Sequence, residues 1–217
     1  MILNNKTKRL LIYFVGLFIL ALGLTLNTKA NLGVSPIISV PYSISQITGL
    51  NFGDLTFIEY ALFVFVEIMI HLSEKNKKKI VADLLQLPLS LVFTRLLNIF
   101  SACIPTSSNF LVQLLILVLA IICTGIGAAM SLSMQLVPNP GDGIVQALAG
   151  KFNKSVGLTK NMFDCLSVCI TLCISLIFAH TILGIGIGTV IAVLGVGRVI
   201  ALFHHMFESQ IIELVQG

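Results

Sequence analysis

The stretch Leu-Val-Pro-Asn-Pro-Gly-Asp-Gly, residues 136–143, directly follows a long apolar run, where a membrane-spanning helix is expected to end. Its two prolines remove backbone donors, and its two glycines permit unusual backbone dihedrals. Asn139-Pro140 is typical of a helix start, with Asn as the N-cap and Pro at the first helical position. The sequence therefore predicts that one helix stops before this stretch and that a new, short helix starts within it.

A similar stretch, Leu-Gly-Val-Ser-Pro, occupies residues 32–36 in the first half of the chain. An ungapped shift of 104 residues aligns the two halves, pairing Gly23 with Gly127, Leu32 with Leu136, Pro36 with Pro140 and Gly53 with Gly157. Apolar matches carry little weight in so apolar a chain. The glycine and proline matches share one register, and they indicate two copies of one unit.

The composition is that of a membrane protein that crosses the bilayer several times. The 217 residues are 57% hydrophobic and 10% charged, with a mean hydropathy of +1.03, whereas a soluble domain carries about 25% charged residues. The net charge of +4 comes from lysines that flank apolar runs, so it does not indicate nucleic-acid binding. Five cysteines, an odd number lying mostly in apolar runs, do not form a disulfide framework.

Six apolar runs are long enough to cross a membrane: residues 10–30, 55–73, 81–102, 110–132, 161–179 and 182–203. The uncharged segment 37–50 is only 14 residues long, which suits a re-entrant or interfacial segment, and residues 140–153 are expected to match it. In the last run, Gly184 and Gly188 have the G-x-x-x-G spacing of closely packed membrane helices. The tail, residues 204–217, is expected to form a separate amphipathic helix at the surface, because Met206, Phe207, Ile211 and Leu214 fall at helical spacing.

Basic clusters at residues 6–9, 75–79 and 151–160 predict the topology, because short loops rich in Lys and Arg stay in the cytoplasm. Six crossings place all three clusters inside, together with both termini. Three crossings per copy make the copies inverted relative to each other. The predicted fold class is therefore an all-α membrane protein in one domain, residues 1–217, with inverted three-helix repeats at about 10–102 and 110–203.

The chain resembles the YczE/YitT-type family of bacterial multi-pass membrane proteins, and more its YczE side. The resemblance rests on Gly23-Leu24-Thr25-Leu26 before residues 30–36, and on residues 49–53, 139–143 and 186–191. It implies an inner-membrane protein of similar length and helix number. It assigns no catalytic or substrate residues.

The two broken segments are the first candidate binding region. Inverted repeats with broken helices are the construction of many secondary transporters, whose sites lie where free helix ends meet. Asn31, Ser35, Asn139 and Asp142 are predicted to line a polar region there, with Asp142 able to bind a cation or a proton. The alternative is that these residues are ordinary caps of loops at the membrane surface.

Charged residues inside apolar runs are the second group of candidates, because burying a charge in a membrane costs about 2.5–3.5 kcal/mol and usually serves a function. Glu59, Asp164 and Arg95 are predicted to contribute to the same site. The alternative is that Glu59 and Asp164 are hydrated at the two interfaces and that Arg95 extends its charge to water.

No Walker loop, nucleophile elbow or His-Glu-x-x-His motif occurs, so the chain is not expected to be an enzyme, and no cofactor or metal is predicted. The leading hypothesis is a transporter of a small molecule or ion, with its site between the repeats. The alternatives are a chaperone-like accessory membrane protein and a substrate-binding subunit of a larger transporter. The expected partners are the lipid bilayer and an unidentified substrate, and a homo-oligomer or a partner membrane protein stays open.

Overall fold

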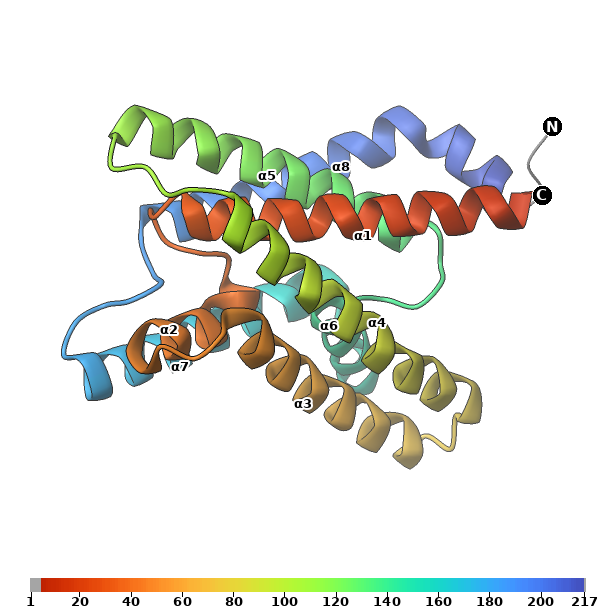
Figure 1. Ribbon diagram of the computed structural model, residues 1–217. Helices are drawn as coiled ribbons and strands as arrows, with labels where there is room; N and C mark the ends of the chain where they lie inside the picture. The colour runs from red at the N-terminus through yellow and green to blue at the C-terminus, as the bar shows by residue number, and fades with distance from the viewer. Residues whose placement is uncertain (1–4, 217) are drawn as a thin grey trace. The chain divides into compact units, whose positions relative to one another are not determined.

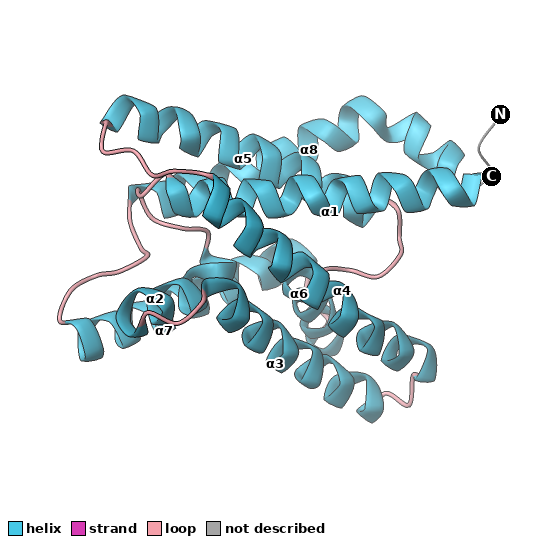
Figure 2. Cartoon of the chain, viewed as in Figure 1, coloured by secondary structure: helices cyan, strands magenta, loops and turns pink. Residues whose placement is uncertain are grey.

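The computed structural model describes residues 5–216, without the side chains of Glu208, Ile212 and residues 214–216. All regular structure in this range is helical (Figure 2). The elements are α1 (Asn5–Lys29), η1 (Pro36–Ile38), α2 (Ser39–Thr48), α3 (Phe52–Ser73), α4 (Lys77–Cys103), α5 (Phe110–Ser133), α6 (Pro140–Phe152), α7 (Val156–Ala179) and α8 (Ile187–Gln216). Residues 1–4, Gly217 and the Leu214 side chain of the predicted tail lie outside the described residues.

Six helices of the described chain are long and apolar enough to cross a membrane: α1, α3, α4, α5, α7 and residues 187–207 of α8. The predicted number of spans is confirmed. Four of the helices start earlier than the apolar runs, and polar side chains cap two of them, α3 and α7. The Asn51 side chain accepts a hydrogen bond from the Asp54 amide at 2.9 Å, and Ser155 accepts one from the Leu158 amide at 3.3 Å.

The last helix differs from the prediction. It starts at Ile187 rather than 182, and it continues through the tail without a break as far as Gln216. Gly184 precedes the helix and has a φ of 79°, so the expected G-x-x-x-G pair within one helix is wrong. The Gly188 amide instead donates to the Leu32 carbonyl at 2.7 Å, which fixes the start of α8 against the stretch after α1.

The chain packs as two compact units. The first contains residues 1–35, 99–136 and 186–217, and the second contains residues 36–98 and 137–185. Helix α4 contributes to both, with its part up to Asn98 in the second unit and its last turn in the first.

The first unit is built on close packing of α1 along α5, and α8 packs mainly against α5 (Figure 1). A Cβ atom added at Gly23 would collide with the Thr124 backbone nitrogen, and one added at Gly127 would collide with that of Leu20. Since neither glycine has a side chain, the two helix backbones approach closely, as small residues allow in membrane proteins.

The second unit contains both short helices. Helix α2 packs against α7 and α3, and α6 packs against α3 and α7. Their starts meet, because a Cβ atom added at Gly141 would lie 2.7 Å from Cγ1 of Ile37. Each short helix therefore buries one face against the long helices α3 and α7.

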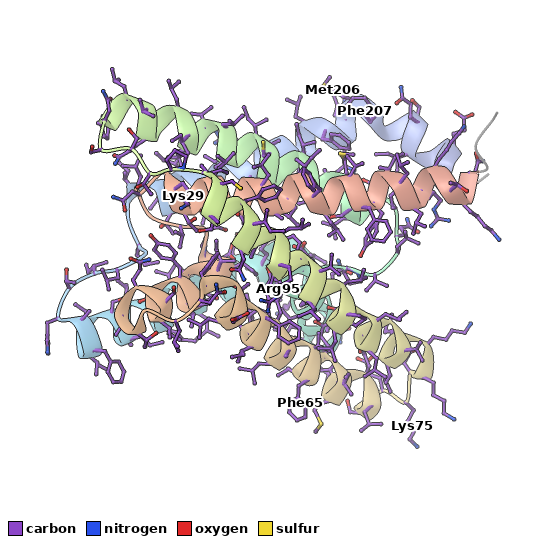
Figure 3. All side chains as sticks on the ribbon, in the orientation of Figure 1. Lys29, Phe65, Lys75, Arg95, Met206 and Phe207 are labelled. Carbon is purple, nitrogen blue, oxygen red and sulfur yellow. The ribbon has the colours of Figure 1, made fainter. Side chains whose placement is uncertain are left out.

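Large apolar side chains cover the outer faces of the long helices. Phe65, which points away from α3 in Figure 3, is 61% exposed, and Leu115 on α5 is 70% exposed. Apolar surface of this extent is unfavourable in water and matches lipid tails. The protein therefore contacts the bilayer through these faces.

Candidate functional site

The site is built around the start of α6. The Asn139 side chain accepts a hydrogen bond from the Gly141 amide at 3.1 Å, and Pro140 occupies the first helical position. The amides of Asp142 and Gly143 both donate to the Asn139 carbonyl at 2.8 Å. The predicted N-cap is confirmed, and it places Asp142 in the first turn, where the helix dipole favours a carboxylate.

Tyr60 connects this helix start to α3. Its ring is fully buried, and Asn139, Glu59 and Asp142 are all close enough to interact with its hydroxyl. Three of the sequence candidates, Glu59, Asn139 and Asp142, are thus brought together around a tyrosine that sequence reasoning did not select.

Asp164 of α7 completes the group. It is buried, and its Oδ1 lies 3.4 Å from Nζ of Lys160, one turn earlier on the same helix. Burial raises the pKa of the partly buried Asp142, the Lys160 ammonium opposes this shift, and the Asp164 carboxylate adds to it. The charged groups of α6 and α7 therefore influence one another.

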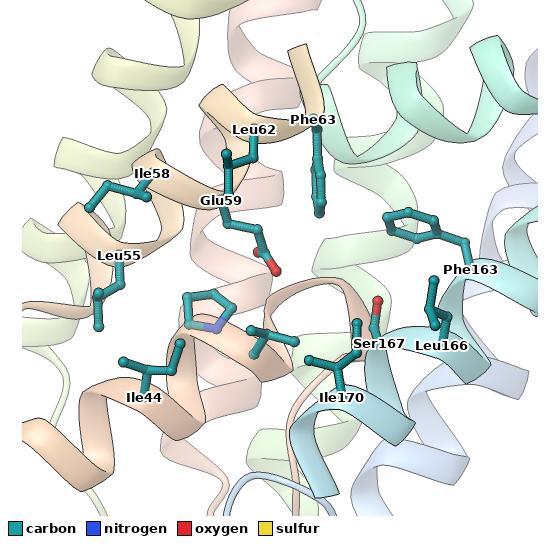
Figure 4. A pocket seen from close by; sticks show the side chains of 12 residues that line it. Ile44, Leu55, Ile58, Glu59, Leu62, Phe63, Phe163, Leu166, Ser167 and Ile170 are labelled. Carbon is teal, nitrogen blue, oxygen red and sulfur yellow. The ribbon is translucent and has the colours of Figure 1, made fainter. Parts of the chain in front are cut away.

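A cavity of about 290 Å³ lies beside Glu59, between α2, α3 and α7. The Glu59 carboxylate points into it, toward Phe63, Phe163 and Ser167 (Figure 4). The rings of Phe63 and Phe163 meet edge to face, with centroids 5.3 Å apart. Apart from Glu59 and Ser167, the lining side chains are apolar, so the carboxylate is the only charged group there.

The Glu59 carboxylate lacks an internal partner. Its Oε2 atom is buried and has no hydrogen-bond partner among the described residues. Leaving a carboxylate buried and unpaired is costly, so Glu59 favours binding of a proton or a cation. Phenyl rings beside a carboxylate also suit organic cations, because aromatic faces attract them.

The remaining candidates lie elsewhere. Arg95 forms an ion pair with Asp54, and about half of each side chain is exposed. Asn31 is exposed, with a φ of 55°, and the Ser35 amide donates to the Asn27 side chain. Asn31 and Ser35 belong to the first unit, whereas the group around the start of α6 belongs to the second. The binding roles of these residues stay predictions.

Sequence reasoning missed Tyr60 and Lys160 as parts of the group. Tyr60 lies in an apolar run, where a tyrosine resembles ordinary core. Lys160 was used only to orient the chain, although its i,i+4 spacing from Asp164 was a usable signal. No cluster of metal-ligating side chains occurs among residues 5–216 that the structure describes.

Comparisons with known proteins agree with this description. The model of a family of unknown function (DUF6198) matches residues 7–205. The chain is 27% identical over 192 residues to the uncharacterized membrane protein YczE of Bacillus subtilis (strain 168), an alignment that covers 87% of this chain and 81% of the relative. No solved structure matches. The resemblance inferred from the motifs is confirmed, and the similarity is to a membrane protein whose role is uncharacterised.

Proposed function

Because the chain belongs to a family of unknown function (DUF6198), we propose its function from the geometry of the second unit: it transports a small molecule or ion across the membrane. The site contains Glu59, Asn139, Asp142 and Asp164. The observation that carries the proposal is the Glu59 carboxylate, which faces an apolar cavity with one oxygen unpartnered. Packing alone gives no reason to keep a charge there.

The inverted repeat is part of the proposal, and reciprocal contacts support it. Residues 20 and 23 correspond to residues 124 and 127 under the shift of 104. Gly23 lies against Thr124, and Gly127 lies against Leu20, so each copy makes the same contact with the other. Such an exchange is the mark of a two-fold relation.

The pairing of helices follows the same exchange. Helix α2 corresponds to α6, and α3 corresponds to α7. The contacts of α2 with α7 and of α6 with α3 are then equivalent. The cavity beside Glu59 takes α2 and α3 from one proposed repeat and α7 from the other, as expected for a transport site between repeats.

The proposed orientation completes the picture. In the proposed orientation both termini lie in the cytoplasm of a bacterial cell and the protein lies in the inner membrane; six candidate crossings and the basic clusters support it. The chain then forms one integral domain without enzymatic activity.

The substrate class follows from the lining of the cavity. One carboxylate among apolar side chains and two phenyl rings favours a cation with an apolar part, because the charge pairs with Glu59 and the rest removes apolar surface from water. A quaternary ammonium ion attached to an aromatic ring has this chemistry.

The test is uptake of radiolabelled benzyltrimethylammonium into liposomes that contain the purified protein. The parent protein is expected to take up the cation faster than protein-free liposomes do. Glu59→Gln keeps the shape of the side chain but removes its charge, and it is expected to lower the initial rate by about tenfold or more.

The matched control is Glu74→Gln, a second carboxylate substitution on an exposed side chain just after α3. It is expected to leave uptake unchanged. Equal rates for the parent protein and protein-free liposomes, or for the parent and Glu59→Gln, would contradict the proposal.

A further inference from the structure

A second cavity in the same unit, of about 280 Å³, is separate from the one beside Glu59. It lies between α3, α4 and α6, and its lining includes Glu67, His71, Lys79 and Asp83. Lys79 is exposed and follows the α3–α4 turn, whereas Glu67 is only 1% exposed. The cavity therefore leads from a hydrated turn to a buried carboxylate.

Two unpartnered acceptors lie at this buried carboxylate, one on Glu67, which lines the cavity, and one on Gln86, which is bonded to Glu67. The Gln86 side-chain amide donates to Oε2 of Glu67 at 2.7 Å. Oε1 of Glu67 and Oε1 of Gln86 have no hydrogen-bond partner among the described residues, although both side chains are 1% exposed. Buried polar atoms are nearly always hydrogen-bonded, so two orphan oxygens on touching side chains point to a missing donor.

The neighbouring charges are mainly negative. Asp83 is close enough to Glu67 for their carboxyl groups to interact. His71 is hydrogen-bonded to Asp83, with Nδ1 2.7 Å from Oδ2 of Asp83. Lys79 is paired with Glu74 at 3.7 Å on the exposed side. Among the described residues that line the cavity, no buried Lys or Arg faces Glu67.

Helix α6 leaves room for these groups. A Cβ atom added at Gly143 would lie 2.7 Å and 2.9 Å from the two carboxylate oxygens of Glu67. The Gly143 amide cannot satisfy Glu67, because it donates to the Asn139 carbonyl within its own helix. The glycine thus supplies space beside the carboxylate and no donor.

At the equivalent positions in the other half of the chain, the side chains are hydrogen-bonded directly to one another. A shift of 104 residues relates Gly143 to Ser39 and Glu67 to Thr171, and it relates Ala147 to Ser43 and His71 to Ser175. There, Ser39 bonds Thr171 at 2.7 Å, and Ser43 bonds Ser175 at 2.8 Å. These four hydroxyl side chains are fully buried. Packing of a short helix on a long one therefore requires no carboxylate, imidazole or cavity.

From this geometry we propose that the cavity at Glu67 and Gln86 binds a small organic cation carrying N–H donors, such as a guanidinium or primary ammonium group. The cation donates to Oε1 of Glu67 and Oε1 of Gln86, and its charge pairs with Glu67. A quaternary ammonium ion has no N–H group and leaves both oxygens unpartnered. Metal ions lack a sufficient set of ligands among the described residues. The proposal concerns binding alone and does not require transport.

The experiment is calorimetric titration of the purified full-length protein in lipid nanodiscs, with methylguanidinium as the probe. The parent protein is expected to bind it saturably. Glu67→Gln removes the charge, and it is expected to weaken binding by about tenfold or more, as for the loss of a charged hydrogen bond. Tetramethylammonium has no donors, so any heat that it gives is expected to be the same for the parent and for Glu67→Gln.

Gly143→Ala provides a second variant in case Glu67→Gln fails to fold. The added methyl group displaces the Glu67 carboxylate, the mobile end of a side chain, and alanine favours the helix, so this variant is expected to fold and to lose binding. Asp54→Asn, at an exposed ion pair on α3, is the control and is expected to bind like the parent. The proposal is overturned by a parent that does not bind methylguanidinium, by unchanged binding in Gly143→Ala, or by tetramethylammonium binding that Glu67→Gln weakens equally. Failure of benzyltrimethylammonium uptake alone bears on the transport proposal and leaves this one standing.

Discussion

At the scale of single residues, the start of α6 concentrates the most consequential chemistry. Asn139 uses its backbone carbonyl and its side chain to satisfy the free amides of the helix, and it also contacts Tyr60. One residue thus fixes the helix start and links it to α3. Because Asn139 caps the helix, Asp142, three positions later, lies in its first turn.

Asp142 gives a prediction about pH. Burial raises the pKa of Asp142 above its ordinary value of 3.8, so the folded protein binds this proton more tightly than the unfolded chain does. The resulting stabilisation is complete below that ordinary value, and it is lost as the pH rises through the raised folded value. Asp142→Asn should therefore melt at an increasingly higher temperature than the parent as the pH rises over this range.

The measurement is the melting temperature of both proteins in one detergent across the acidic range. Lys160, Asp164 and Glu59, the other titratable groups near Asp142 and Tyr60, are present in both proteins, so their effects largely cancel. The exposed variant Asp54→Asn should show no such gain. A difference between Asp142→Asn and the parent that shrinks with rising pH would contradict the assigned direction.

Local rules in the sequence selected several of the residues that the structure brings together in the second unit. Asn139 follows from helix-start statistics, and Glu59 and Asp164 follow from the cost of charge in an apolar run. Gln86 gave no such signal, because a neutral amide in a membrane helix is common. Its importance depends on facing Glu67, a contact between helices that no spacing along one helix encodes.

At the scale of elements, the contact of α1 with α5 gives a second prediction. Gly127→Ala places a methyl group against the Leu20 backbone. The gain in helix propensity, about 1 kcal/mol, is outweighed by overpacking of about 1–3 kcal/mol or more, because helix backbones cannot yield as side chains do. The free energy of unfolding is therefore expected to fall.

The matched control is Gly157→Ala in the first turn of α7, where a Cβ atom would meet no heavy atom within 4 Å. This variant should be as stable as the parent or slightly more so. The check is the melting temperature of each purified protein. If Gly127→Ala and Gly157→Ala have the same melting temperature, close approach of α1 and α5 at this residue is not needed.

The bounds of the elements show where local sequence rules end. Hydropathy located the long helices to within a few residues, and proline located both short ones. The start of α8 was wrong, because the apolar residues before Ile187 look helical although Gly184 turns the chain there. The anchor of that start, the Leu32 carbonyl, lies more than 150 residues earlier in the chain.

At the scale of the whole molecule, the number of crossings gives a prediction about sidedness. With six crossings, Lys77 and Ser107 lie on opposite sides of the membrane. In a background without the five native cysteines, a membrane-impermeant thiol reagent should label Ser107→Cys in intact cells. It should spare Lys77→Cys until the membrane is opened.

Labelling of Lys77→Cys in intact cells would contradict the six-crossing topology and, with it, the inverted repeat. Labelling of neither position before the cells are opened would reverse the assignment of the loop at Ser107. Hydropathy and charge were sufficient to make this prediction. They were not sufficient to pair α2 with α7 or α6 with α3, because such pairing depends on which side chains fit one another.

The close packing of α1 against α5 also has a consequence for the order of events during synthesis. Ser133, the last residue of α5, follows Lys29, the last residue of α1, by 104 residues. At about 5–20 residues per second, a ribosome needs about 5–20 s to make that length. Helix α1 is the most buried of the candidate spans in the described chain. During synthesis, the glycine face of α1 therefore stays without its partner for several seconds, until α5 has been made.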